Sequence, residues 1–185
     1  DHAALVDAFT RLAEATGQAR WIAEAVRTAD TMLDWFFDPE QGGLHTTASD
    51  GEALIARQKD LVDGATPSAN STAVIALCRL AALTGEQRYA NHADRILQLL
   101  AAAIEKSPGQ YSNALVATDL RRRGLTEVLI AGDRPDLVRL AQSLWRPDTV
   151  LAWGEAYDSP LWNDRADAYA NVCRNYACQL PPASV

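Results

Sequence analysis

The sequence predicts a mainly α protein made of repeated helical hairpins, with a β-hairpin insertion and a small α/β C-terminal appendage. Three observations predict this fold class: an internal repeat, apolar residues at helical spacing that end at glycines, and a strand–helix–strand order near the C-terminus. The repeat decides the architecture, because a unit that occurs twice is expected to fold in the same way twice.

The internal repeat is ungapped. Residues 11–21 read RLAEATGQARW and residues 79–89 read RLAALTGEQRY, so Arg, Leu, Ala, Thr, Gly and Arg recur at a constant offset. The same offset aligns Ala8 with Ala76, which extends the similarity upstream. Each copy therefore predicts one repeated structural unit.

Each copy predicts two helices. In the first, apolar residues at i, i+4 and i+7 indicate a helix that ends at Gly17, and a second helix follows from about residue 19 to 37. In the second, a helix ends at Gly85 and its partner extends over about 89–103. The helix before Gly85 is apolar around most of its circumference, so we expect it to be covered on more than one side.

A long segment separates the two hairpins. Residues 38–70 are rich in Asp, Gly, Thr, Ser and Pro, with weak strand signals at 44–47 and 53–56. The Asp-Gly pair at residues 50–51 predicts a β-hairpin that turns there with positive φ. A connection of this length is usually functional when it carries no helix of its own.

The last third of the chain predicts a helix at about 111–123, then a strand, a helix and a strand. The two strand signals cover 127–132 and 149–153, and the helical spacing between them covers 135–145. This order predicts a small βαβ-like unit, and its first turn has no G-x-G-x-x-G motif for a nucleotide. We expect residues 1–108 to form the hairpins, with residues 109–185 packed on the same domain.

Composition limits the function classes. The chain has 185 residues, of which 48% are hydrophobic and 22% charged, and its net charge is −7. Without a basic stripe, we expect no nucleic-acid or membrane partner. Three cysteines and no apparent signal segment favour the cytoplasm, and the residues predict no cofactor and no metal. Because the first residue is Asp1, we expect the natural start to lie upstream.

Three segments carry a resemblance to a known family. They read DPEQGGLHTT over 38–47, DLVDGATPSANSTAVIALCRLAALTG over 60–85 and NVCRNYACQLP over 171–181. Together they resemble the C-terminal part of the thioredoxin-domain-containing proteins of the spermatogenesis-associated type. That family looks like a thioredoxin-like domain followed by a six-hairpin toroid, the (α/α)6 fold shared with N-acylglucosamine 2-epimerases and several glycosidases.

The resemblance implies that this chain is a partial (α/α)6 toroid. Two hairpins are about a third of such a ring, so apolar flanks would need the missing N-terminal part of a longer chain or another subunit. Carbohydrate chemistry, glycosidase-like or epimerase-like, is implied by the superfamily alone and only within the longer chain. The chain has no C-x-x-C motif, so the redox role of a thioredoxin-like domain does not transfer to it.

The strongest polar cluster lies at the entrance to the second hairpin. In a toroid, loops at one mouth carry the substrate groups, and hydroxyl, amide and carboxylate groups suit sugar hydroxyls. Asp63 is our candidate catalytic acid or base there. The candidate ligand-binding residues are Arg57, Asp60, Ser68 and Asn70. The alternative is structural: Ser68 or Asn70 caps the next helix, while Asp63 and Gly64 make a turn.

His45 is the second catalytic candidate. It follows Asp38 and a Gly-Gly pair, and a histidine that titrates near neutral pH suits proton transfer. The alternative is a surface or packing residue. Glycosidase chemistry would also need two carboxylates at a defined separation. The candidates for that pair are Glu52, Asp60, Asp63 and Glu155.

Cys173 and Cys178 are our redox candidates. Their C-R-N-Y-A-C spacing leaves three alternatives open: a disulfide across a tight turn, a relay to a thioredoxin-like domain, or two small buried side chains. Zinc would require two more ligands than this stretch offers. Cys78 lies in the apolar helix and is expected in the core.

These observations give two functional hypotheses. The first is the C-terminal fragment of a toroid protein with a carbohydrate-type ligand at the mouth of the ring. The second is a non-catalytic helical module that docks a thioredoxin-like domain or another subunit.

Overall fold

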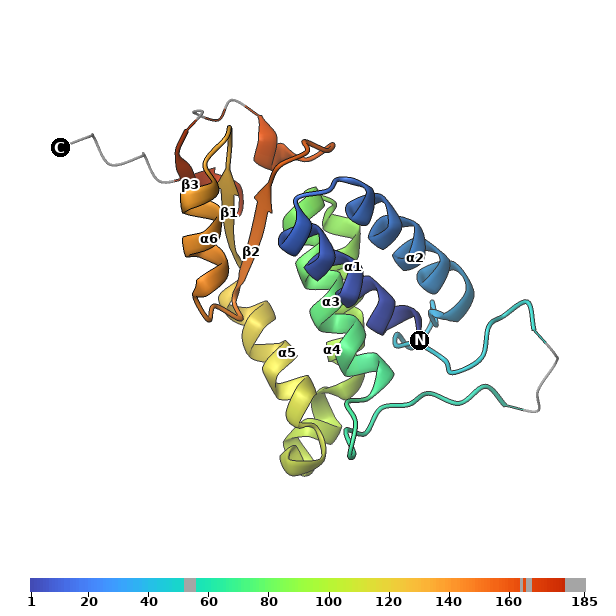
Figure 1. Ribbon diagram of the computed structural model, residues 1–185. Coiled ribbons are helices and arrows are strands. Elements are labelled where there is room, and N and C mark those ends of the chain that lie inside the picture. The colour runs from blue at the N-terminus through green and yellow to red at the C-terminus, as the bar shows by residue number, and fades with distance from the viewer. Residues whose placement is uncertain (52–55, 164, 166–167, 179–185) are drawn as a thin grey trace.

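The computed structural model describes residues 1–51, 56–163, 165 and 168–178. Figure 1 shows a helical body beside a small sheet that carries one helix of its own. The helices of the body are α1 (His2–Thr16), α2 (Arg20–Phe36), α3 (Ala69–Thr84), α4 (Gln87–Lys106) and α5 (Ser112–Arg123). The remaining elements are η1 (Pro108–Gln110), β1 (Thr126–Ile130), α6 (Pro135–Ser143), β2 (Thr149–Trp153), η2 (Pro160–Trp162), β3 (Ala170–Arg174) and β4 (Ala177–Cys178).

Both predicted helical hairpins are present. The first helix of each copy ends at a glycine in the left-handed region, Gly17 with φ 66° and Gly85 with φ 80°. The N–H of each glycine donates to a carbonyl four residues earlier, which satisfies one of the free carbonyls at the helix end. The turn to the second helix follows at once, as the repeat predicts.

α3 is the central helix of the body. α1 packs on one side of α3 and α5 on another, while α2 packs against α1 and α4 against α3 (Figure 1). The prediction that α3 is covered on more than one side is confirmed, because three helices pack on it and Val74, Leu77 and Leu83, on different sides of α3, are fully buried. The two hairpins therefore lie side by side; their continuation into a closed ring stays a prediction.

The segment between the hairpins forms an irregular antiparallel excursion. His45 pairs with Lys59, and the N–H of Thr46 donates to the carbonyl of Gln58. The described pairing thus uses residues 58–59, while the expected strand at 53–56 lies, but for its last residue, outside the described residues. The expected turn geometry is wrong, since Gly51 has no positive φ.

The C-terminal third contains the predicted βαβ unit. β1 and β2 are parallel and joined through α6, and two further strands give the order β2-β1-β3-β4 with β3 antiparallel to both neighbours. Side chains alternate across this sheet. Val128 and Ile130 pack with α6 on one face, while Leu129 packs with η2 on the face toward the helical body. α6 therefore forms an outer layer on the sheet.

None of the helices in the described part of the chain is long and apolar enough to cross a membrane. Within the same described residues, no three His, Cys, Asp or Glu side chains gather in a way that could hold a metal ion.

Candidate functional site

Asp63 lies between the N-termini of two helices. Its Oδ1 accepts hydrogen bonds from the backbone N–H of Ser68 (2.8 Å) and the hydroxyl of Ser71 (2.6 Å), at the start of α3. Its Oδ2 accepts from the backbone N–H groups of Asn113 (2.8 Å) and Ala114 (3.0 Å), at the start of α5. Burial alone would raise the pKa of Asp63, but these four donors outweigh it and the pKa is lowered. The geometry gives Asp63 a capping role.

Ser68 and Asn70 are also engaged within the protein. Ser68 is the N-cap of α3, and its Oγ accepts from the N–H of Ser71 at 3.1 Å. Asn70 is fully buried, where its Oδ1 accepts from the N–H of Leu44 (2.6 Å) and its Nδ2 donates to the carbonyls of Leu44 (3.0 Å) and Asp60 (2.8 Å). Asn70 thus fastens the excursion to α3.

Arg57 and Asp60 make backbone contacts as well. The guanidinium of Arg57 donates to the carbonyls of Thr47 and Trp35, the latter at 3.0 Å near the end of α2. Asp60 is exposed, and its Oδ2 accepts from the N–H of Ala69 at 3.0 Å. Both residues stabilise the course of the excursion.

His45 lies beside the carboxylate of Asp38, a partner that the sequence alone did not indicate. Its Nε2 is 3.6 Å from Asp38 Oδ2, and its Nδ1 is 3.2 Å from the carbonyl of Arg57. The same Asp38 oxygen accepts from Lys59 Nζ at 2.7 Å. That bond, together with the N–H donors of Glu40 and Gln41, lowers the pKa of Asp38 strongly. The structure therefore places His45 beside the largely buried ion pair of Asp38 and Lys59.

The excursion does not bring the proposed carboxylate pair together. Glu155 lies at the α1–α2 connection, where its Oε2 accepts from the N–H of Ala19 at 2.9 Å. That connection is at the opposite end of the hairpins from Asp63 (Figure 1). Glu52 lies outside the described residues. Asp60 and Asp63 share the N-terminal end of α3, but each carboxylate accepts backbone N–H groups there.

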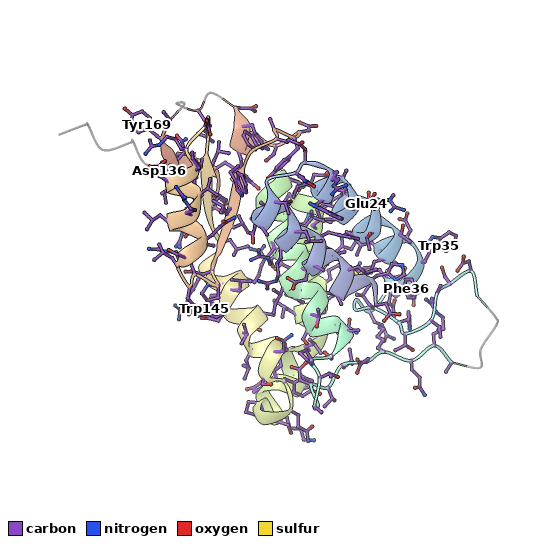
Figure 2. All side chains as sticks on the ribbon, viewed as in Figure 1. Glu24, Trp35, Phe36, Asp136, Trp145 and Tyr169 are labelled. Carbon is purple, nitrogen blue, oxygen red and sulfur yellow. A yellow bond between two sulfur atoms is a disulfide. The ribbon has the colours of Figure 1, made fainter. Side chains whose placement is uncertain are left out.

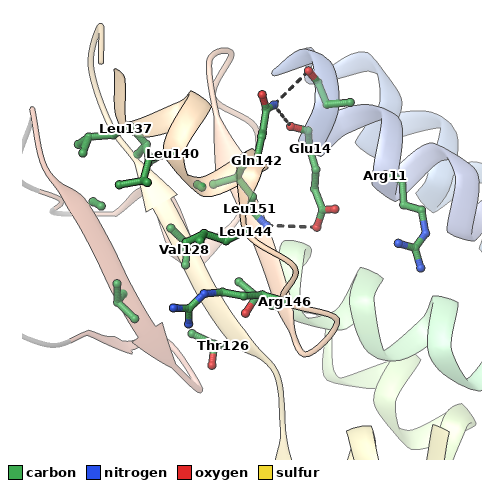
Figure 3. A pocket seen from close by; sticks show the side chains of 16 residues that line it. Arg11, Glu14, Thr126, Val128, Leu137, Leu140, Gln142, Leu144, Arg146 and Leu151 are labelled. Atoms are coloured by element: carbon green, nitrogen blue, oxygen red, sulfur yellow. Dashed lines mark hydrogen bonds between the residues drawn. The ribbon is translucent and has the colours of Figure 1, made fainter. Parts of the chain in front are cut away.

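A groove of about 580 Å³ lies elsewhere, between α1, α6 and the sheet (Figure 3). Most of its wall is aliphatic, and its polar side chains are Arg11, Glu14, Thr126, Gln142, Arg146 and Thr149. Leu140 on α6 and Leu144 just after it are 57% and 47% exposed, and the neighbouring Trp145 is 90% exposed (Figure 2). The groove is lined by Arg11, Glu14, Ala15, Thr126, Val128, Ile130, Leu137, Leu140, Ala141, Gln142, Leu144, Arg146, Thr149, Leu151, Ala170 and Val172.

A buried ion pair lies behind this groove. Arg79 on α3 is 2% exposed; its Nη2 is 2.6 Å from Glu14 Oε2 and its Nε is 3.8 Å from Asp7 Oδ1. The other oxygen of Glu14 accepts from the N–H of Leu151 on β2 at 3.1 Å. Burial raises the pKa of Glu14, and the charge of Arg79 opposes that effect only in part. Glu14 therefore ties α1 to both α3 and the sheet.

Of the three alternatives for Cys173 and Cys178, the structure shows the disulfide, which links β3 to β4. Cys78 is a buried free thiol, as predicted. The intervening turn places Asn175 and Tyr176 at positive φ, and their N–H groups each donate to the Glu127 carboxylate at 3.2 Å. The Tyr176 hydroxyl donates to the carbonyl of Ala81 at 2.6 Å. The disulfide turn is thereby fixed to the end of α3.

The sequence interpretation missed the groove. Its lining comes from α1, α6 with the residues just after it, and three strands, spread between residues 11 and 172, so no local pattern reveals it. The ion pair behind the groove did have a sequence signal: Arg79 lies in an otherwise apolar helix, and a charged residue there requires a partner once it is buried. The acidic residues at Asp7 and Glu14, seven apart on one helix, were the candidates.

Comparison with known proteins supports the resemblance. The chain is 29% identical to human spermatogenesis-associated protein 20 and 27% identical to the mouse protein of that name, each over 200 aligned residues. These alignments cover 98% of this chain and 25% of each relative, so the chain spans about a quarter of the length of the curated relatives it matches. No family model matches the chain.

Proposed function

We propose that this chain is a non-catalytic helical module that forms the C-terminal part of a longer thioredoxin-domain-containing protein and docks another folded part of it. One observation carries this proposal: the groove between α1, α6 and the sheet exposes aliphatic side chains to solvent. Contiguous exposed apolar surface on a folded domain is typical of an interaction site.

The groove suits a protein surface with an apolar centre. Leu140, Leu144 and Val172 expose aliphatic area around it, and Trp145 stands beside it as a large anchor. Aromatic and aliphatic anchors of this kind supply most of the affinity in protein interfaces. Arg11 and Arg146 lie in the lining, so the partner is expected to carry acidic groups around its apolar centre.

The contacts of the segment between the hairpins support a structural role for its polar side chains. The side chains of Asp63, Ser68 and Asn70 are hydrogen-bonded to the protein itself. A sugar would have to displace these bonds, and each buried group left unpaired costs roughly 1–3 kcal/mol. The carbohydrate site with Asp63 and His45 as catalytic groups therefore stays a prediction, and the docking module is the function that the geometry supports better.

The test is a binding titration. The other part of the longer protein proposed above is produced separately and titrated into this chain by calorimetry. We expect a dissociation constant of about 1 μM or tighter, which corresponds to roughly −8 kcal/mol. Leu144→Asp should weaken binding at least tenfold, because it places a charge in the apolar centre.

Val116→Asp is the matched control, since Val116 is 58% exposed on α5 and does not line the groove. It should leave binding unchanged, and circular dichroism should show both variants folded. Absence of any binding by the folded chain, or equal binding by the Leu144→Asp variant, would reject the groove as the docking site.

A further inference from the structure

The disulfide between Cys173 and Cys178 sets the geometry of one short turn. The two cysteines are five residues apart in sequence, so the bond closes a very small loop. A crosslink that closes a small loop removes little conformational freedom from the unfolded chain, and a chain of 185 residues buries enough surface to fold without one. The role of this disulfide is therefore local.

The hairpin that the disulfide closes is weak by itself. Within the described residues, β4 has two residues and pairs with β3 at two positions. Two residues of the turn, Asn175 and Tyr176, have φ of 51° and 62°, which residues other than glycine adopt at an energetic cost. A two-stranded hairpin of this length is not stable in water without a further link. The disulfide supplies that link to the disulfide turn, residues 174–177.

The disulfide turn joins this edge of the sheet to the helical body. On β1, Glu127 lies opposite Cys173 in the register, so both side chains lie on the same face of the sheet. Glu127 is 3% exposed, and its carboxylate accepts from the N–H groups of Asn175 and Tyr176. The Tyr176 hydroxyl donates to the carbonyl of Ala81 on α3. If the turn moved away, the buried carboxylate would lose both donors, so water would have to enter.

A cavity of about 90 Å³ lies behind the disulfide turn. Its lining includes Asn175 and Tyr176 from the turn, Glu127 from β1 and Cys78 from α3. Cys78 is a free thiol that is 6% exposed, and burial raises its pKa to about 12. With the turn in place, this thiol stays protonated and reacts poorly. Displacement of the turn would remove part of the cavity wall and expose the thiol to solvent.

We propose that Cys173 and Cys178 form a reversible redox site, and that their disulfide holds the turn over this cavity. Reduction by a dithiol frees the disulfide turn from Glu127 and α3 and opens the cavity to the thiol of Cys78. The site is separate from the groove of the proposed function, because the two share no lining residue in the described part of the chain. Side chains alternate along β1 and β3, which places the groove and the redox site on opposite faces of the sheet.

The reduction transfers two electrons from the dithiol. A thiolate of the dithiol attacks the sulfur of Cys178, because Cys178 is half-buried whereas Cys173 is 2% exposed. The S–S bond breaks, Cys178 becomes linked to the reductant, and Cys173 leaves as a thiolate that takes a proton from water. The second thiolate of the dithiol then attacks the linked sulfur of the reductant. This step releases Cys178, which is protonated in turn, and leaves the reductant as a disulfide. An oxidised dithiol runs the same steps in reverse.

Hydrogen exchange of the whole chain tests the proposal, with dithiothreitol as the reductant. Mass spectrometry follows peptides that contain residues 171–178 in the oxidised and the reduced protein. The N–H groups of Asn175 and Tyr176 should exchange about tenfold faster or more after reduction, because they lose the Glu127 acceptor. Peptides from β2, in the same sheet, are the internal control and should exchange at an unchanged rate. Oxidised dithiothreitol should restore slow exchange of the turn.

A double variant, Cys173→Ala with Cys178→Ala, reports on the cavity through Cys78. Cys78 is then the single cysteine, and it is also the free thiol of the oxidised wild type. A thiol reagent should label Cys78 about tenfold faster or more in the double variant than in the oxidised wild type. Local opening exposes little surface, so this labelling rate should change little with urea below the unfolding transition.

Two single variants refine the labelling test. Tyr176→Phe keeps the disulfide but loses the bond to Ala81, so it should label at a rate between those of the wild type and the double variant. Val116→Asp, at an exposed position on α5, is the control and should label like the wild type.

Three results would overturn the proposal. They are a disulfide that dithiothreitol does not reduce in the folded chain, a reduced chain whose turn exchanges as slowly as the oxidised one, and labelling of Cys78 that rises only when the whole chain unfolds. If the double variant does not fold, hydrogen exchange of the wild type decides alone. The groove variant Leu144→Asp should change neither measurement, so failure here and failure of groove docking are read separately.

Discussion

Replacing Asp63 with alanine should destabilise the chain, because the Asp63 carboxylate accepts hydrogen bonds from the N-termini of two helices. The carboxylate accepts four hydrogen bonds, two from the start of α3 and two from the start of α5. Loss of a helix cap costs roughly 0.5–2 kcal/mol, so two helices together give about 3 kcal/mol for Asp63→Ala. Asp63→Asn keeps one acceptor oxygen and should cost about half as much.

Urea unfolding followed by circular dichroism measures this effect. For a chain of this size the dependence on urea is roughly 2–3 kcal/mol per M, so Asp63→Ala should lower the midpoint by about 1 M. Because the pKa of Asp63 is lowered on folding, its contribution is present above the ordinary value of 3.8 and is lost as the pH falls through the lowered value. The variant should therefore lose less stability on acidification than the wild type.

Asp60→Asn is the matched control, because Asp60 is an exposed aspartate in the same segment with a single bond to the N–H of Ala69. It should change the free energy of unfolding by less than about 1 kcal/mol. If Asp63→Ala proves as stable as this control, the capping role of Asp63 is refuted, and its candidacy as an acid or base gains weight.

Three further outcomes follow from buried polar groups. Asn70→Ala should cost about 2–4 kcal/mol in urea unfolding, because it leaves buried backbone groups of Leu44 unpaired; a cost near zero would contradict the fastening role. Arg79→Met should cost about 3 kcal/mol or more in the same assay, since it leaves the Glu14 carboxylate without its cation; a stabilised variant would disprove the pairing. Burial raises the pKa of Glu127, so this residue should make wild-type stability fall as the pH rises from 4.5 through the raised value; Glu127→Gln should reduce that fall, and an unchanged pH profile would refute the assignment.

Local patterns predicted the helices well. Gly17 and Gly85 were assigned as helix ends from sequence, and both adopt the positive φ that glycine tolerates best. The βαβ unit was also predicted, because its strands and helix differ in apolar spacing. These features depend on residues within one or two turns of each other, where a single sequence is most informative.

The candidate site was harder to predict, because its contacts join distant parts of the chain. Asp63 was identified as a polar residue near a helix start, but its bonds to Asn113 and Ala114 depend on how α5 packs beside α3. The partner of His45 was near in sequence, yet Asp38 meets it only after the excursion turns back. Residue type alone could not distinguish a cap from a catalytic carboxylate.

The turn between Cys173 and Cys178 shows an intermediate case. The spacing allowed a disulfide without requiring one, and the residues at the turn decided the outcome. Asn175 adopts positive φ more readily than most residues, which favours a tight reversal that brings the two cysteines opposite each other. Tyr176 follows with positive φ as well, held by its bond to α3, a contact that no local pattern indicates.

The glycines that end α1 and α3 also determine where the α/β part can sit. A Cβ at Gly17 would lie 2.9 Å from the ring of Trp153, and one at Gly85 would lie 2.5 Å from Pro160. Both hairpins therefore have the same end closed by the C-terminal third, while the excursion occupies the other end. A chain that ends at residue 108 would lack both contacts, so the apolar surfaces beside Gly17 and Gly85 would be exposed. We therefore expect the helical part to aggregate when it is produced alone. Any cleft shared by a longer stack of hairpins would open at the excursion end.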